Sequence, residues 1–418
     1  MVEYNTQKNP GSLPADFGFN PNYRETLQKY PSLFPSTPSE QAPDVIAYVD
    51  PKFKMPQVWR SNLNVDIQLP YDFMLSVGAM YTRDIYNVAQ INMNEAEPTG
   101  VYNEQPDRIY WASKKYEYND YTNGKNVVVK LSNGEDKGYQ YSFNAILTKK
   151  YDFGFTGSIG YTYTMAKDLT ANPGSAPNSA WQNNVAVNSL NDPGVSYSLF
   201  STPHRIIANA SYEINYAKCL KTTFSLFYSG YHTGRYSYTY YNDMNGDGNY
   251  SDLIYVPNYQ DEMTSVDITD KSGAITYSAV DQAKDFWDFV NNDSYLKDRK
   301  GKYVERNGSL TPWINRFDFK IAQDFYATLG GRKYGIQVSL DMLNVGNMIN
   351  SKWGAYQSCG LKSYDNVQLL KTASKVGEPL TYQINANSRE AFKERSSWQY
   401  TNTIGSAWSM QLGVKVTF

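Results

Sequence analysis

The last eleven residues, 408–418, alternate between apolar and polar side chains without an exception and end on an aromatic residue. Because successive side chains of a β-strand point to opposite faces, this pattern predicts a strand with one apolar and one polar face. Segments of about ten alternating residues, separated by turn residues, are typical of strands that cross an outer membrane within a barrel. The apolar face of this strand would carry Trp408, Met410, Leu412, Val414, Val416 and Phe418.

The same alternation recurs along the chain and predicts about nine antiparallel strands. The expected ranges are 57–69, 73–86, 138–149, 153–167, 204–214, 220–234, 313–325, 333–346 and 406–418. Strands of this length are about twice as long as the usual 5 to 6 residues in globular proteins. They match the roughly 9 to 11 residues that a tilted strand needs to cross a bilayer.

The connections between these strands alternate between short and long. Turns near residues 70, 151, 217 and 329 are short, and four connections are long and polar: 98–136, 168–203, 232–312 and 349–406. Outer-membrane barrels have short periplasmic turns and long extracellular loops, an asymmetry that a large soluble all-β protein would not explain. We therefore expect an all-β antiparallel transmembrane barrel in the outer membrane of a Gram-negative bacterium. Its apolar faces would contact lipid, and its long loops would be extracellular.

Composition agrees with this fold class. A mean hydropathy of -0.59 suits a barrel, in which only every second strand residue needs to be apolar. The 38 tyrosines fit a membrane protein, because tyrosine prefers the headgroup level of a bilayer. With a net charge of -2, nothing suggests a nucleic-acid partner.

Strand directions predict that the barrel is incomplete. If the final strand runs inward and there are about nine strands, the first strand also runs inward. Two strand edges then remain unpaired, and lipid cannot form the hydrogen bonds that they need. Residues 1–56 would then form a partly irregular extracellular segment, with a short helix around Tyr23 to Tyr30 and no signal peptide. Residues 57–418 would be the C-terminal part of a larger barrel.

One loop carries a candidate metal site. Asp243, Asn245, Asp247, Asn249 and Asp252 place oxygen-bearing side chains at the spacing of the first half of an EF-hand calcium loop, with Gly248 at the sharp turn. The bidentate glutamate of that motif is replaced by isoleucine, so Asp252 would have to serve instead. A structural Ca²⁺ and an ordinary tight turn both remain open, because turns use the same residue types.

Charged residues also occupy the polar phase of the strands, which should face the barrel lumen. They are Arg60, Asp66, Glu213, Arg316, Asp318, Lys320 and Asp341. On a lipid face, a mid-bilayer Arg or Lys would cost roughly 2 to 4 kcal/mol. These groups would either contact a plug or substrate, or form a hydrated ladder of compensating charges.

We do not expect an enzyme. The two histidines, His204 and His232, lie near Ser201 and Ser229, but no nucleophile elbow, phosphate-binding loop or zinc spacing is present. The tyrosine-rich stretches 236–241 and 116–121 would offer stacking and hydrogen bonds to a ligand, or else be variable surface decoration.

Several stretches resemble the Oar-like TonB-dependent receptors of Bacteroidetes, relatives of the SusC type, from about residue 45 onward. The matching stretches are 48–63, 202–206, 243–248 with 252–255, 303–308 with 312–318, 341–347 and the terminal Phe418. In this class, the terminal aromatic strand resembles the signal that is read by the barrel-assembly machinery. The resemblance implies a barrel of about 22 strands closed by an N-terminal plug and energised through a TonB box.

The resemblance also implies what this chain would do. It would supply about the last nine strands of a receptor that takes up a bulky nutrient such as a glycan, a peptide or a chelate. Its partners would be the missing N-terminal barrel and plug of the same receptor, the TonB complex through that part, and a surface lipoprotein. The alternative function is a passive pore or a surface adhesin that is anchored by a barrel.

Overall fold

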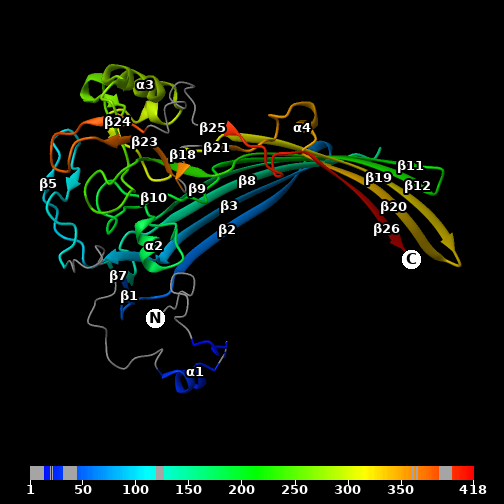
Figure 1. Cartoon of the computed structure of the whole chain (residues 1–418). Helices are drawn as coiled ribbons and strands as arrows, with labels where there is room; N and C mark the ends of the chain where they lie inside the picture. Colours follow the sequence, from blue (N-terminus) through cyan, green and yellow to red (C-terminus); the bar gives the residue numbers. More distant parts are fainter. Residues whose placement is uncertain are drawn as a thin grey trace.

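The computed structural model describes residues 14–18, 20, 22–31, 45–118, 127–359, 362–363, 366–385 and 398–418. Its main feature is a long, curved antiparallel sheet with a compact assembly of connections at one end (Figure 1). In sheet order, the strands are β2 (Gln57–Leu69), β3 (Phe73–Tyr86), β8 (Tyr139–Lys150), β9 (Phe155–Asp168), β11 (His204–Tyr216), β12 (Leu220–His232), β19 (Trp313–Leu329), β20 (Arg332–Leu343) and β26 (Ser409–Thr417). The expected all-β antiparallel architecture is confirmed.

Each of the nine expected ranges overlaps one of these strands, and the differences lie at strand ends. The largest extension is in β19, which runs to Leu329, four residues beyond the expected end. There Leu329 pairs with Arg332 across a turn of only two residues, Gly330 and Gly331. Both glycines have positive φ, +59° and +78°, which a two-residue hairpin turn of the type favoured by strand twist requires.

The register of the sheet places the apolar side chains of successive strands on one face. Leu412 of β26 pairs with Leu340 of β20, which pairs with Ile321 of β19. On the opposite face, Lys320 pairs with Asp341. A shift of one residue would move every apolar side chain of a strand to the polar face, so the alternation itself specifies the register.

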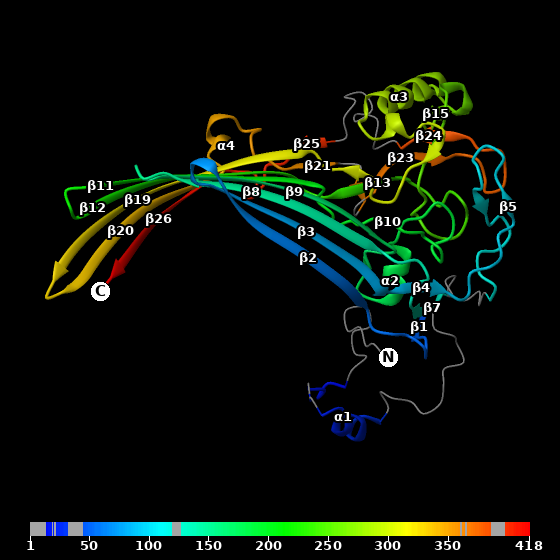
Figure 2. The same ribbon diagram turned by 180° about the vertical axis from the view of Figure 1, so that it is seen from behind.

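The sheet has two free edges among the described residues. β2 pairs only with β3, and β26 pairs only with β20. Because nine strands alternate in direction between these edges, β2 and β26 run the same way. Figures 1 and 2 show this sheet from its two sides.

The long connections form one packed assembly, which we call the cap: the described parts of 87–138, 169–203, 233–312 and 344–408. It holds the helices α2 (Pro177–Gln182) and α3 (Ala279–Asn292) and the 3-10 turns Gln260–Glu262 and Leu296–Asp298. The short helix α4 (Gly346–Ile349), at the start of the last connection, lies apart from this assembly, over the middle of the sheet (Figure 1). Its strands are β4 (Ala89–Asn92), β5 (Gly100–Val101), β6 (Ile109–Tyr110), β7 (Val127–Ser132), β10 (Ser196–Tyr197), β13 (Arg235–Tyr240), β14 (Tyr255–Val256), β15 (Ile268–Thr269), β16 (Ile275–Tyr277), β17 (Lys302–Tyr303), β18 (Ser309–Leu310), β21 (Gln357–Cys359), β22 (Lys362–Ser363), β23 (Asn366–Thr372), β24 (Tyr382–Ile384) and β25 (Trp398–Tyr400).

The cap has its own hydrophobic core. Tyr102, Val185, Tyr238, Phe286 and Leu369 are buried together in one cluster, although they come from all four long connections. A core of this kind stabilises a domain by removing apolar area from water. The long connections therefore fold as one unit rather than as separate surface loops.

The N-terminal segment is only partly described. α1 (Tyr23–Lys29) lies within the range expected for a short helix, and the side chain of Asn22 caps it by accepting a hydrogen bond from the backbone N of Arg24. β1 (Val45–Val49) pairs in parallel with β7 of the cap, which the sequence did not predict. A 3-10 turn at Pro70–Asp72 joins β2 to β3. No helix within the described ranges combines the length and apolarity needed to cross a membrane.

Candidate functional site

The expected metal-binding loop follows β13 and lies inside the cap. Asn245, Asp247, Asn249 and Asp252 are 0%, 5%, 5% and 3% exposed. Backbone hydrogen bonds to the loop's own side chains give it its shape. Both carboxylate oxygens of Asp243 accept them, from the backbone N atoms of Gly246 (2.8 Å) and Gly248 (2.9 Å).

The other side chains of the loop act in the same way. Asn245 Oδ1 accepts a hydrogen bond from the backbone N of Asp247 at 3.0 Å, and Asp247 Oδ1 accepts one from Asn249 N at 2.7 Å. Gly246 has φ +83°, and a Cβ at this position would lie 2.6 Å from the carbonyl oxygen of Trp111. A residue with a side chain at position 246 would therefore be strained and would also collide with the neighbouring segment.

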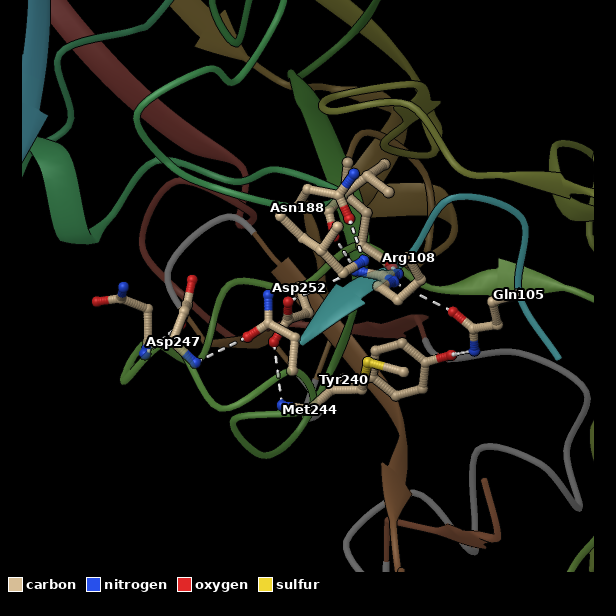
Figure 3. A network of polar contacts seen from close by, with 12 residues as sticks. Gln105, Arg108, Asn188, Tyr240, Met244, Asp247 and Asp252 are labelled. Carbon is tan, nitrogen blue, oxygen red and sulfur yellow. Dashed lines mark hydrogen bonds and ion pairs between the residues drawn. The ribbon is translucent and has the colours of Figure 1, made fainter. Parts of the chain in front are cut away.

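Arg108, which no sequence motif singles out, pairs with the last carboxyl group of this loop. Its side chain is fully buried, and Nη1 lies 3.5 Å from Asp252 Oδ1 (Figure 3). The guanidinium also donates hydrogen bonds to the carbonyl oxygens of Val187 and Leu253, and Nε donates to Gln105 Oε1 at 3.1 Å. One cation thus joins three connections of the cap.

The tyrosine-rich stretch 236–241 also has a role that the sequence did not predict. Tyr236, Tyr238 and Tyr240 are 3%, 0% and 0% exposed, so neither ligand stacking nor surface decoration describes them, whereas Tyr241 of the same stretch is 46% exposed and is accessible to a ligand. Tyr240 accepts a hydrogen bond from Gln105 Nε2 at 2.9 Å. These three side chains belong to the cap core, where apolar rings pack and the hydroxyls find partners.

The two described tyrosines of the second tyrosine-rich stretch, 116–121, differ in exposure. Tyr116 is 4% exposed, and Tyr118 is 66% exposed. Residues 119–121 lie outside the described residues. Only Tyr118 of the described pair is available to a ligand.

Burial raises the pKa values of all three carboxyl groups in the loop. The pKa of Asp252 rises to about 7, because burial and the charge of Asp243 outweigh the opposing effect of Arg108. Burial, followed by the charges of Asp252 and Asp243, raises the pKa of Asp247 well above its ordinary value. The loop therefore holds more negative charge than Arg108 can offset when the carboxyl groups are ionised.

We expect the cap to become less stable as pH rises. A carboxyl group whose pKa is raised on folding stabilises the folded state fully below its unfolded-chain pKa, here 3.8. That stability is lost as pH rises through the folded value of about 7. The thermal midpoint of cap unfolding, measured in EDTA at about pH 5 and about pH 8, should be lower at the higher pH. An equal or higher midpoint at about pH 8 would contradict this assignment.

The acidic groups of the loop do not by themselves make up a metal site among the described residues. Among the described residues, no three carboxylate, imidazole or thiolate groups converge closely enough to hold a metal ion by themselves. A calcium site would also need amide, backbone or water oxygens. The three carboxylates and two asparagines of the prediction do occupy one buried loop.

The expected polar-face charges are engaged with neighbours on the sheet. Lys320 Nζ lies 2.8 Å from Asp341 Oδ1, across the hairpin of β19 and β20. Arg316 donates to the hydroxyl of Tyr356 at 3.2 Å, and Asp318 accepts a hydrogen bond from the backbone N of Asn344 at 2.7 Å. Asp341 therefore pairs with Lys320.

The remaining charges follow the same pattern. Ser76 donates to Asp66 at 2.5 Å, and Arg60 Nε donates to Thr82 Oγ1 at 3.1 Å. Lys221 lies between Glu213 (3.7 Å) and Asp324 (3.6 Å). Glu213, Lys320 and Asp341 thus form ion pairs, whereas the described contacts of Arg60, Asp66, Arg316 and Asp318 are with uncharged groups. Both alternatives, a ladder of compensating charges and contact with a plug or substrate, stay predictions, as does the facing of these groups toward a lumen.

The two histidines lie among aromatic rings. His204 Nδ1 is 2.7 Å from the hydroxyl of Tyr161, and its ring lies 5.3 Å from that of Tyr163. His232 Nδ1 is 2.6 Å from the carbonyl oxygen of Thr311, and its ring meets Trp313 edge to face. These contacts place both histidines at the cap ends of β11 and β12. The expectation that the chain is not an enzyme stays a prediction.

Comparison with known proteins identifies the family. Residues 2–355 match the family described as "Outer membrane beta barrel domain". The chain belongs to this family. As an outer membrane β-barrel domain, it is a protein of the outer membrane, and the apolar face of its long antiparallel sheet suits a lipid environment. No curated protein and no solved structure matches the chain.

Proposed function

We propose that the chain is the C-terminal part of the barrel of a TonB-dependent receptor that imports a bulky nutrient, such as a glycan, a peptide or a chelate. The observation that carries this proposal is the pair of free edges, β2 and β26, on a sheet of an outer membrane β-barrel domain. Unpaired backbone groups cannot remain in the hydrocarbon region, so further strands must close the sheet.

The direction of the edges restricts what closes them. Since β2 and β26 run the same way, antiparallel closure needs an odd number of additional strands. A second copy of this nine-stranded sheet would meet it with parallel edges at both seams. An upstream segment of the same receptor that supplies about thirteen strands would satisfy the parity and give the 22 strands of the Oar-like receptors of Bacteroidetes.

That receptor would also contain the parts that make transport active. We propose an N-terminal plug, a TonB box that contacts the TonB complex, and a surface lipoprotein as partners. In this arrangement the long connections, which form the cap, are extracellular. The short turns are periplasmic, and the polar face of the sheet lines the lumen.

The alternative is a passive pore or an adhesin anchored by the barrel. The packed core of the cap supports the adhesin, because a folded surface domain is what an adhesin would present. A passive protein would need neither a plug nor TonB. The two alternatives therefore differ in the domains that the protein contains and in whether it needs energy from TonB.

The proposal is tested on the native protein, isolated from outer membranes with an antibody against the cap. We expect peptides from a plug and a TonB box in the same polypeptide, chemical cross-linking to TonB, and uptake that a protonophore abolishes. A native polypeptide of 47.6 kDa that does not cross-link to TonB would contradict transport. Conductance that a protonophore leaves unchanged would then favour the pore. A lack of conductance would favour the adhesin.

A further inference from the structure

We propose that the apolar face of the sheet binds one phosphate-bearing lipid at its cap end. Two basic side chains, Arg83 of β3 and Lys167 of β9, hold the headgroup phosphate, and a groove around Ala79 holds an acyl chain. The site lies on the face of the sheet opposite to the polar face, so it is independent of transport. A receptor, a pore and an adhesin would all keep it.

The register of three neighbouring strands brings the two basic residues into one row. Arg83 pairs with Tyr139 of β8, and Tyr139 pairs with Lys167. Paired residues share a face, and neighbouring strands lie about 4.8 Å apart, so the backbone positions of the two basic residues are about 10 Å apart. Along β3, Arg83 has the same phase as Tyr81 and Ala79. The row therefore belongs to the apolar face.

This row lies at the level of lipid headgroups. β3 begins at Phe73, next to a short turn, and Arg83 comes ten residues later. At about 3.3 Å per residue and a tilt of roughly 40°, this length spans about 25 Å of membrane, the height of the apolar band of a barrel. The next row toward the turn contains Tyr81 and Tyr141, and tyrosine prefers the membrane interface. Basic groups at this level meet phosphates rather than hydrocarbon.

Neither basic side chain has an acidic partner within the described ranges. Arg83 is exposed, and the ion pairs and side-chain hydrogen bonds of the described residues do not include it or Lys167. Lys167 Nζ instead lies over the ring of Tyr197, 4.7 Å from its centroid. On the polar face, by contrast, Lys221 and Lys320 are both paired with carboxylates. The two unpaired cations leave a positive site on the lipid side, which an anion such as phosphate would neutralise.

An apolar groove of about 540 Å³ adjoins the row. Ala79 forms its floor, because this small side chain lies between its two cross-strand partners, Leu63 and Phe143. Both partners project from the sheet and are 67% and 53% exposed. The groove is lined by Ser61, Asn62, Leu63, Ala79, Met80, Tyr81, Tyr141 and Phe143. Its walls are mainly hydrocarbon and aromatic rings, which suit an acyl chain.

A lipid is the one ligand that uses both parts of this site. Inorganic phosphate would occupy the basic row and leave the groove empty, and an uncharged hydrocarbon would do the reverse. In a phosphate-bearing lipid the headgroup lies at the membrane surface and the chains lie toward the bilayer centre. The basic row and the groove follow each other in the same order, with Arg83 nearer the cap than Ala79.

The test measures lipid bound to the full 418-residue chain in detergent by native mass spectrometry. We expect one molecule of dioleoyl phosphatidic acid to bind at least about tenfold more tightly than dioleoyl phosphatidylcholine, which has the same chains and no net charge. Inorganic phosphate should not displace it. Equal binding of the two lipids, or displacement by phosphate, would overturn the proposal. A lipid-free dimer would also overturn it, because a second copy would then cover the groove.

Matched variants separate this site from the overall charge of the protein. Arg83→Gln combined with Lys167→Gln should remove most of the preference for phosphatidic acid, because each basic residue near a lipid surface contributes a factor of about five in affinity. Lys271→Gln combined with Lys284→Gln removes the same charge from exposed positions of the cap and should change nothing. Ala79→Trp fills the groove and should weaken the binding of both lipids.

Two outcomes with these variants would contradict the site. Equal losses in the two double variants would assign the preference to net charge. Unchanged binding in Ala79→Trp would show that the groove does not hold the acyl chain. If a variant does not fold, the comparison of the two lipids on the wild-type chain decides the question.

Discussion

Replacing Arg108 by methionine should unfold the cap under conditions in which the wild-type cap remains folded. The substitution keeps much of the aliphatic stem but leaves the buried carboxyl group of Asp252 without its cation and the carbonyls of Val187 and Leu253 without a donor. Breaking one partner of a buried ion pair typically costs about 3 to 5 kcal/mol. The free energy of cap unfolding in urea, followed by proteolysis of the cap, measures this loss.

Two further variants define the interpretation. Lys114→Met removes a solvent-exposed ion pair, with Glu117 at 2.6 Å, and should cost no more than about 1 kcal/mol. Adding Asp252→Asn to Arg108→Met should recover part of the loss, because the unpaired carboxyl group disappears. A loss for Arg108→Met as small as that of Lys114→Met would show that the buried pair does not hold the cap.

Replacing Leu412 by arginine should impair the assembly of the sheet in a bilayer. Leu412 lies near the middle of β26 on the apolar face, opposite Leu340, and its side chain is 72% exposed on the free sheet. An arginine on the lipid face near the bilayer midplane costs roughly 2 to 4 kcal/mol. The folded fraction after reconstitution into liposomes, read from a heat-modifiable band, reports the effect.

The adjacent residue supplies the control. Gln411 pairs with Asp341 on the polar face, so Gln411→Arg introduces the same side chain on the other side of the same strand. It should assemble nearly as well as the wild type. If both substitutions impaired assembly equally, the assignment of the apolar face to lipid would be wrong.

The sheet could be read from the sequence because its signal is local. Within each strand, the alternation of apolar and polar residues identifies the two faces, and turn residues such as Gly330-Gly331 mark the strand ends. The expected ranges therefore fall close to the observed strands. The free edges also followed from counting strand directions. Nothing in these inferences required knowing which distant residues meet.

The cap could not be predicted, because it depends on contacts between distant segments. The stretch containing Tyr238 alternates in an ordinary way, but all six residues of β13 are buried because distant segments, including α3 and β23, pack around it. The turn residues of the loop at 243–252 were recognisable, but its burial was not. Arg108 carried no signal, since an isolated arginine after a proline and an aspartate looks like any exposed charge.

The wide sequence separation within the cap has a consequence for the order in which the protein matures. Gln105 donates a hydrogen bond to the hydroxyl of Tyr382, 277 residues later, and β13 pairs in parallel with β23. Contacts of such high contact order form slowly, and here they need nearly the whole polypeptide. The cap is therefore the last part to mature: strand hairpins can join one after another, whereas its core stays open until the connection after β20 arrives.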